Sequence, residues 1–352
     1  MKLDRSLLSV LASLALALAI TPHVLADPLE IDDLPAEQAK EKRMLEEMKQ
    51  ELGGVKGELN DAMKSMSQLT DLANRRAAAI GQVHEFHLFA KAAEVDFGGG
   101  VKAVLPTYNG KIPGPEIHIR EGELVKIVLH NELGEPTSLH MHGLALPHNV
   151  DGLPRAGKPA TSKDAGDAVK PERYLRAKES FAYQFIAPAQ TTAYYHPQVM
   201  HSTQRDNGMY GAIIVHPRLP SKAPDQELTL FFGKHQDKET TYLVNGKTAP
   251  AIPAIELKLG TRVRLHLFNL TGEAVPLHLS GHRFEVVAEN GSDPLEPHVF
   301  RDTITLNPAD RLDLDFIADN PGVWSLSSEK TEQISQGGKF PRGIAVVVRY
   351  KN

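Results

Sequence analysis

From Val83 onward the chain consists of short runs in which apolar and polar residues alternate between turn-forming residues. Such runs are typical of β-strands with one buried face. Two blocks share one order of features: an Asn-Gly turn, prolines, a strand, a second asparagine and a histidine segment. The asparagines are Asn109 and Asn131 in the first block, and Asn245 and Asn269 in the second. This internal repeat predicts two copies of one β-domain, each a Greek-key sandwich.

A proline-rich connector over residues 217–224 separates the two blocks. We therefore expect an all-β fold with one sandwich domain over residues 83–218 and another over residues 225–352. A chain of 352 residues is long enough for two domains with separate cores. The net charge of −5 and the lack of a Lys/Arg run indicate no nucleic-acid partner.

The first 26 residues have the pattern of a secretory signal peptide. A basic start and an apolar run over residues 7–20 lead to Val24-Leu25-Ala26. We expect cleavage after Ala26 and a periplasmic or secreted mature protein without a membrane span. The alternative is an uncleaved membrane anchor, for which the apolar run is short.

Residues 27–80 form a third kind of segment, rich in Glu, Lys, Ala and Met. Apolar residues recur in it at alternating steps of three and four: Leu45, Met48, Leu52, Val55, Leu59, Ala62, Met66, Leu69 and Ala73. This spacing predicts a helix that forms a coiled coil between chains, and hence an oligomer. The alternative is an amphipathic helix folded back onto the β-domains. Gly53, Gly54 and Gly57 disfavour a rigid helix by about 1 kcal/mol each relative to alanine.

Histidines cluster in three segments with β-type sequence around them, at His140-Met141-His142, at His196 and at His278. Side chains two residues apart on a strand face the same side, so His140 and His142 can share one metal region. Copper(II) favours imidazole nitrogens, and three or four of them suffice for one ion. The chain has no cysteine, so it cannot form a blue (type 1) copper site, which requires a thiolate.

These segments resemble the copper motifs of the multicopper oxidase family, in the family's order, over roughly residues 83–349. The residues that carry the resemblance are Asn109-Gly110, Pro113-Gly114-Pro115, His140-Met141-His142-Gly143, Asp151-Gly152-Leu153-Pro154, Tyr195-His196-Pro197, Leu277-His278-Leu279 and Pro321-Gly322-Val323-Trp324. The resemblance implies two cupredoxin-like domains. It also implies that His140 and His278 are type 2 copper ligands and that His142 and His196 belong to a type 3 pair. Two-domain members assemble as trimers, so a homotrimer is a further expectation.

The sequence departs from the family pattern at several ligand positions. Gln198 and Ser280 stand where histidines are expected, and Ser327-Ser328-Glu329 replaces the final His-Cys-His run. These departures argue against a dinuclear type 3 centre and a trinuclear centre. With type 1 copper also missing, ordinary laccase chemistry is not expected. The expected centre is a reduced, type 2-like site with one copper ion.

Two further residues are candidates near this centre. His201 either supplies a ligand in place of Gln198 or lines the same cavity. Asp151 either acts as a proton relay, a role that the resemblance implies, or forms a turn with Gly152. Five other histidines carry no motif and are expected to be ordinary surface or core residues: His118, His130, His235, His266 and His298.

Three functions are compatible with these features. The first is a copper-dependent oxidoreductase that acts on a small molecule, such as an oxygen species or a nitrogen oxide. The second is a non-enzymatic periplasmic copper-handling protein, although methionine-rich tracts are lacking. The third is a metal-free cupredoxin scaffold for protein partners. We expect a secreted copper-binding protein whose partner is copper or a small-molecule substrate.

Overall fold

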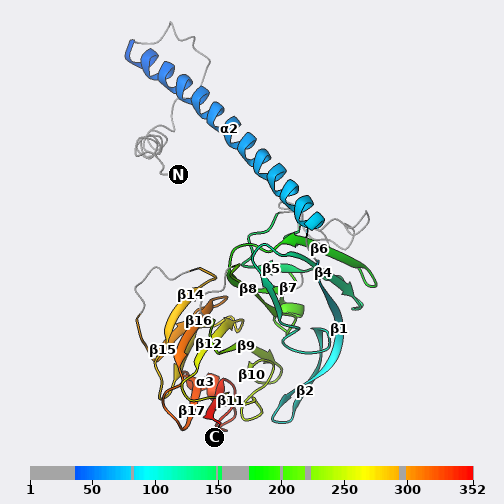
Figure 1. The fold of residues 1–352 in the computed structure, drawn as a ribbon, viewed down its shortest axis with the longest axis vertical. Coiled ribbons are helices and arrows are strands. Elements are labelled where there is room, and N and C mark those ends of the chain that lie inside the picture. The colour runs from blue at the N-terminus through cyan, green and yellow to red at the C-terminus, as the bar shows by residue number, and fades with distance from the viewer. Residues whose placement is uncertain are drawn as a thin grey trace. The chain divides into compact units, whose positions relative to one another are not determined.

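The structure is a computed structural model that describes residues 36–80, 83–147, 150–152, 174–198, 201–218, 223–292 and 299–351. It divides into two compact units, residues 1–72 and 73–352 (Figure 1). The signal peptide predicted for residues 1–26 lies outside the described residues. Among the described residues, no helix is both long enough and apolar enough to cross a membrane.

The N-terminal helical segment is one helix, α2 (Ala36–Ile80), of 45 residues. It continues without a break through Gly53, Gly54 and Gly57, because the Glu, Lys, Leu and Met residues around them are strong helix formers. Much of its apolar stripe is exposed to solvent, including Leu45, Leu52, Val55, Leu59 and Met66. An exposed stripe of this kind is typical of a helix that pairs with another helix.

The first sandwich consists of two four-stranded sheets. One has the order β2 (Val101–Tyr108), β1 (His84–Gly98), β4 (Leu124–Asn131), β6 (Ser180–Ile186). The other has the order β3 (Ile117–Arg120), β8 (Gly211–His216), β7 (Thr191–His196), β5 (His140–His142). Alternation along the strands sends Val125, Ile127 and Leu129 of β4 into the same buried core as Ala193 and Tyr195 of β7.

The second sandwich consists of two five-stranded sheets. One has the order β10 (Thr240–Val244), β9 (Gln226–Gln236), β12 (Arg262–Asn269), β16 (Arg311–Ile317), β14 (Glu285–Glu289). The other has the order β11 (Ile255–Leu257), β18 (Ala345–Tyr350), β17 (Val323–Ser328), β13 (Val275–Leu279), β15 (Thr303–Leu306). Within the described ranges, the short helices are η3 (His201–Arg205) and α3 (Thr331–Ile334). These sheets confirm the expected all-β fold with a helical N-terminal segment.

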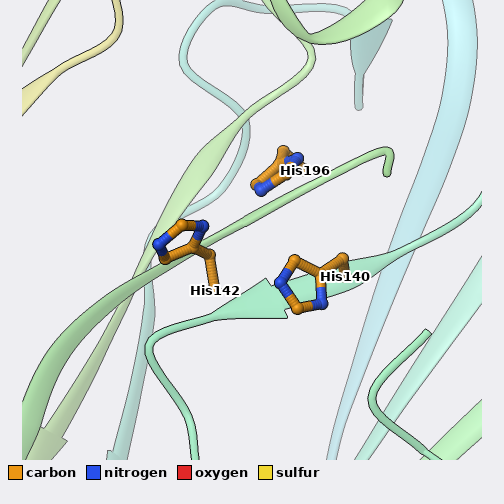
Figure 2. A group of neighbouring side chains, drawn as sticks. All are labelled: His140, His142 and His196. Carbon is orange, nitrogen blue, oxygen red and sulfur yellow. The ribbon is translucent and has the colours of Figure 1, made fainter. Parts of the chain in front are cut away.

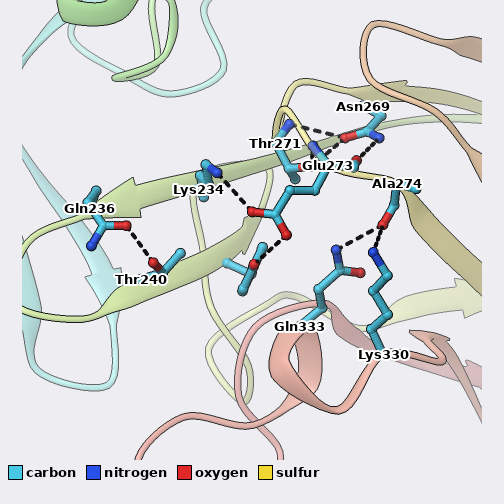
Figure 3. Close-up of polar contacts among 10 residues, drawn as sticks. Lys234, Gln236, Thr240, Asn269, Thr271, Glu273, Ala274, Lys330 and Gln333 are labelled. Atoms are coloured by element: carbon cyan, nitrogen blue, oxygen red, sulfur yellow. Dashed lines mark hydrogen bonds and ion pairs between the residues drawn. The ribbon is translucent and has the colours of Figure 1, made fainter.

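The asparagines of the internal repeat make the same contacts in both sandwiches. Asn109 Oδ1 accepts a main-chain N–H of β1 at 2.7 Å, and Asn245 Oδ1 accepts one of β9 at 2.8 Å. Asn131 Nδ2 donates to the carbonyl four residues later at 2.9 Å, and Asn269 Nδ2 does the same to Glu273 at 2.7 Å (Figure 3). The repeated asparagines therefore fix equivalent turns in two copies of one fold.

The outer face of sheet β3-β8-β7-β5 packs against the outer face of sheet β10-β9-β12-β16-β14. Tyr194, which points away from the first core, contacts Phe268 at 5.9 Å between ring centroids, and Phe268 stacks on Phe231 at 4.3 Å. These rings belong to one buried apolar cluster with residues from both sandwiches. Because side chains alternate, the polar residues on the same two faces also lie between the sandwiches or along this seam.

Candidate metal centre

Three histidines of the first sandwich are brought together by the pairing of β5 with β7. His140 lies opposite His196, and His142 lies opposite Tyr194, in the antiparallel register. Met141 is buried in the core, so both histidines of β5 point to the other face of the sheet. One potential ligand nitrogen from each histidine lies within 4.8 Å of the others, and Figure 2 shows the three rings converging from the two strands.

Main-chain carbonyls orient two of these rings. His140 Nδ1 lies 2.8 Å from the carbonyl oxygen of Asp151, and His196 Nδ1 lies 2.9 Å from that of Pro197. A carbonyl can only accept, so each Nδ1 carries the proton and donates it. In the neutral ring this leaves the lone pair on Nε2, the atom that can bind an ion.

Tyr194 positions the third ring. It stacks on His142, with centroids 4.6 Å apart, and on His196, with centroids 5.1 Å apart. Its hydroxyl oxygen lies 3.2 Å from His142 Nδ1. Burial raises the pKa of Tyr194, so the hydroxyl stays protonated at neutral pH. Tyr194 therefore restricts the rotation of both histidines that it contacts.

The electrostatics around His196 favour its neutral imidazole. Burial lowers the pKa of His196 well below its usual value, and the nearby His140, Arg205 and His142 lower it further, against a raising effect of the bond to Pro197. Metals bind the neutral form of histidine. Three neutral imidazoles at these distances fit a copper ion, since copper(II) accepts three or four nitrogen ligands.

Asp151 contacts His140 through its main-chain carbonyl and through its side chain. Its carbonyl accepts the His140 hydrogen bond, and its carboxylate Oδ2 lies 3.6 Å from the same His140 Nδ1. The adjacent Gly152 has φ +77°, and a Cβ there would lie 1.7 Å from the carbonyl oxygen of Leu139. Only glycine allows the turn to pack this closely against the strand that carries His140.

His278 is not part of this group within the chain. It lies on β13, in the sheet of the second sandwich that does not pack against the first. Its Nδ1 lies 2.9 Å from Thr303 Oγ1, and with His282 and Asp302 it lines a separate cavity of about 520 Å³. His201 is the first residue of η3, and its side chain lies outside the described part of the structure.

A second group was missed in the sequence. His118, His216 and Glu227 also present potential ligand atoms within 4.8 Å of one another, and in the described ranges only these two groups do so. We expected His118 to be an ordinary residue. Its spacing from Glu116 places both on one strand face, but His216 and Glu227 come from other strands and share no local motif with it.

Comparison with known proteins places this chain in a family. Residues 90–220 and residues 220–340 each match a family model described as multicopper oxidase. The "Probable nitrite reductase-hydroxylamine oxidoreductase fusion protein" of Kuenenia stuttgartiensis is 31% identical over 260 residues, which are 68% of this chain and 28% of that protein. Copper resistance protein A of Escherichia coli is 30% identical over 189 residues, 53% of this chain and 28% of that protein. The chain thus spans little more than a quarter of the length of either relative.

A solved structure supports the same assignment at the level of the fold. The blue copper oxidase of Nitrosomonas europaea superposes with a TM-score of 0.68 at 24% identity, over 76% of this chain and 86% of that chain. This likeness confirms the two cupredoxin-like domains. Membership of the family implies copper as the cofactor, while the absence of cysteine leaves no type 1 site. Because the two family models together match residues 90–340, this chain belongs to the multicopper oxidase family.

Proposed function

We propose that this is a secreted copper-binding protein that holds one type 2-like copper ion between His140, His142 and His196. The observation that carries the proposal is the convergence of three imidazoles within 4.8 Å, two of them held by carbonyls with Nε2 free of the proton. Bound copper would supply one-electron redox chemistry and an open position for a small molecule. With no type 1 site, electrons would reach this centre directly from a donor.

The surrounding residues have distinct tasks in this proposal. The carbonyls of Asp151 and Pro197 hold the two Nδ1 protons, so that the rings keep one tautomer. Tyr194 packs against two of the rings and limits their rotation. The Asp151 carboxylate, which is largely buried next to His140, is the proton relay for a small molecule bound at the open position. Asp151→Asn keeps the carbonyl, so it should retain copper and slow turnover.

We propose that His278 completes the site from a second copy of the chain. Within one chain it lies in another sheet, and its side chain is about one-third exposed at 30%. Trimeric two-domain members of the family offer the precedent, and the exposed apolar stripe of α2 offers a surface through which copies could associate. His278→Gln should therefore change the copper spectrum of the assembled protein and leave that of the dissociated chain unchanged.

Copper handling without turnover is the second candidate. The relationship to copper resistance protein A favours it. The two functions differ in one measurable respect: an oxidoreductase consumes oxygen or nitrite when copper and a reductant are present. A copper-handling protein binds and releases copper under the same conditions and consumes neither.

The test of the site is copper binding followed by electron paramagnetic resonance. One equivalent of Cu²⁺ is added to the wild type, to His140→Gln/His196→Gln and to a matched control, His87→Gln/His130→Gln. The control removes a histidine pair elsewhere on the first sandwich, with ring centroids 5.2 Å apart. An axial signal in the wild type and the control, lost in the first variant, supports the proposal. Equal binding by all three proteins would refute it.

A further inference from the structure

The second group of potential ligands lies on the same outer face of sheet β3-β8-β7-β5. His118 is on β3, His216 ends β8, and Glu227 lies near the start of β9 in the second sandwich. The parallel register pairs His118 with Ile214, which shares a strand face with His216. The two histidines therefore point to one side, where Glu227 meets them from the other sandwich.

The two rings are arranged as a pair of ligands. They stack with centroids 5.1 Å apart and an interplanar angle of 12°, and a hydrogen bond of 2.8 Å joins His118 Nδ1 and His216 Nε2. A bound ion would displace the proton of this hydrogen bond. At the usual zinc–nitrogen length of about 2.0–2.1 Å, nitrogens 2.8 Å apart subtend about 90° at the metal, so the two rings would separate by about 0.5 Å to give the tetrahedral angle that zinc prefers. On the other side of its ring, His118 Nε2 lies 2.7 Å from Glu116 Oε1. Carboxylates take this position beside many metal-binding histidines and orient the ring.

Negative charge lies next to the histidine pair, and Arg120, Arg264 and His266 act on the same residues. Glu116 and Glu227 are carboxylates, which are ionised at neutral pH, and both lie beside the histidine pair. His266 lies between two carboxylates, with its Nε2 3.9 Å from Glu227 Oε2 and its Nδ1 2.8 Å from Asp313 Oδ1. His216 and Glu227 also line a cavity of about 720 Å³ between the sandwiches, which offers room for a further ligand on the ion.

We propose that His118, His216 and Glu227 bind a divalent transition-metal ion of the zinc class, separate from the copper site, and that this ion links the two sandwiches. Two histidines and one glutamate form an established zinc donor set that leaves an open position. Glu116 orients His118 and does not bind the ion. The ion would join β3 and β8 of one sandwich to β9 of the other, so binding should raise the temperature at which the β-domains unfold.

The experiment is a Zn²⁺ titration of the full chain carrying His140→Gln/His196→Gln, so that the copper site does not contribute. Calorimetry should give one zinc ion per chain, and saturation should raise the unfolding temperature. Adding His118→Gln/His216→Gln should weaken binding at least tenfold and abolish the rise. Adding His87→Gln/His130→Gln should do neither, although that pair has a similar nitrogen separation of 2.9 Å.

Cobalt substitution gives an independent readout. Co²⁺ at two nitrogens and a carboxylate should produce visible absorption bands that Glu227→Gln shifts or removes. Circular dichroism of each metal-free variant checks the fold, which the substitutions should preserve because His118 is exposed and His216 is partly exposed. Absence of zinc binding in the His140→Gln/His196→Gln protein, or equal loss with both added pairs, would overturn the proposal without bearing on the copper site.

Discussion

Gly152→Ala should weaken copper binding although it changes no ligand. At φ +77° an alanine costs about 1–2 kcal/mol relative to glycine. Its Cβ would also lie 1.7 Å from the carbonyl oxygen of Leu139, so the turn must move by about 1.5–2 Å to restore an ordinary contact. A shift of that size lengthens the 2.8 Å contact between the Asp151 carbonyl and His140 Nδ1 beyond hydrogen-bonding distance. His140 then loses the partner that sets its tautomer and direction.

Loss of such a partner typically lowers metal affinity about 10–100-fold. Gly122→Ala is the matched control, since Gly122 has φ +85° and no atom within 4 Å of the added Cβ. The control should lose about 1–2 kcal/mol of stability and keep its copper affinity. Competition titration against a copper chelator measures both affinities, and thermal unfolding measures both stabilities. Equal copper affinities for the two variants would show that the Asp151 carbonyl does not position His140.

Three further predictions concern other parts of the molecule. Burial alone would lower the pKa of His266, but Asp313 and Glu227 outweigh it and raise the pKa to about 9. The resulting stabilisation of the folded state is at most about 3 kcal/mol. It is complete below the pKa of histidine in the unfolded chain, near 6.5, and is lost as the pH rises through 9. The free energy of unfolding, measured by urea denaturation, should therefore differ less between pH 6 and pH 9.5 in His266→Gln than in the wild type. Deleting residues 27–80 should reduce the number of chains per particle in light scattering; an unchanged number would exclude the coiled coil. Tyr194→Phe keeps the aromatic ring stacked on His142 and removes only the hydroxyl, which lies 3.2 Å from His142 Nδ1. Copper affinity should therefore fall less than tenfold. A larger fall would assign the hydroxyl a direct role in the site.

Much of the fold could be predicted from local pattern. Strand alternation and the asparagine turns depend only on residues that are close together in the sequence. The structure shows the same asparagine contacts in both sandwiches. The helix is a partial exception. Gly53, Gly54 and Gly57 argued against a rigid helix, yet α2 is continuous, because the penalty is small beside the propensity of the surrounding residues.

The candidate site was predictable only where one strand carries it. His140 and His142 sit two residues apart, so the period of a strand predicts their common face, whereas His196 entered through the family resemblance. The orienting role of the Asp151 carbonyl has no sequence signal, because any residue supplies a carbonyl. The group of His118, His216 and Glu227 depends on how two sandwiches pack, which no local spacing encodes.

The central claim is that His140, His142 and His196 hold one copper ion. Its most direct test is metal analysis and electron paramagnetic resonance of the mature protein in a His118→Gln/His216→Gln background, where the second group cannot contribute. We predict about one copper per chain with an axial type 2 signal and nitrogen hyperfine structure, both lost on adding His140→Gln/His196→Gln. No retained copper, or copper that is indifferent to those two substitutions, would contradict the account and favour a metal-free scaffold.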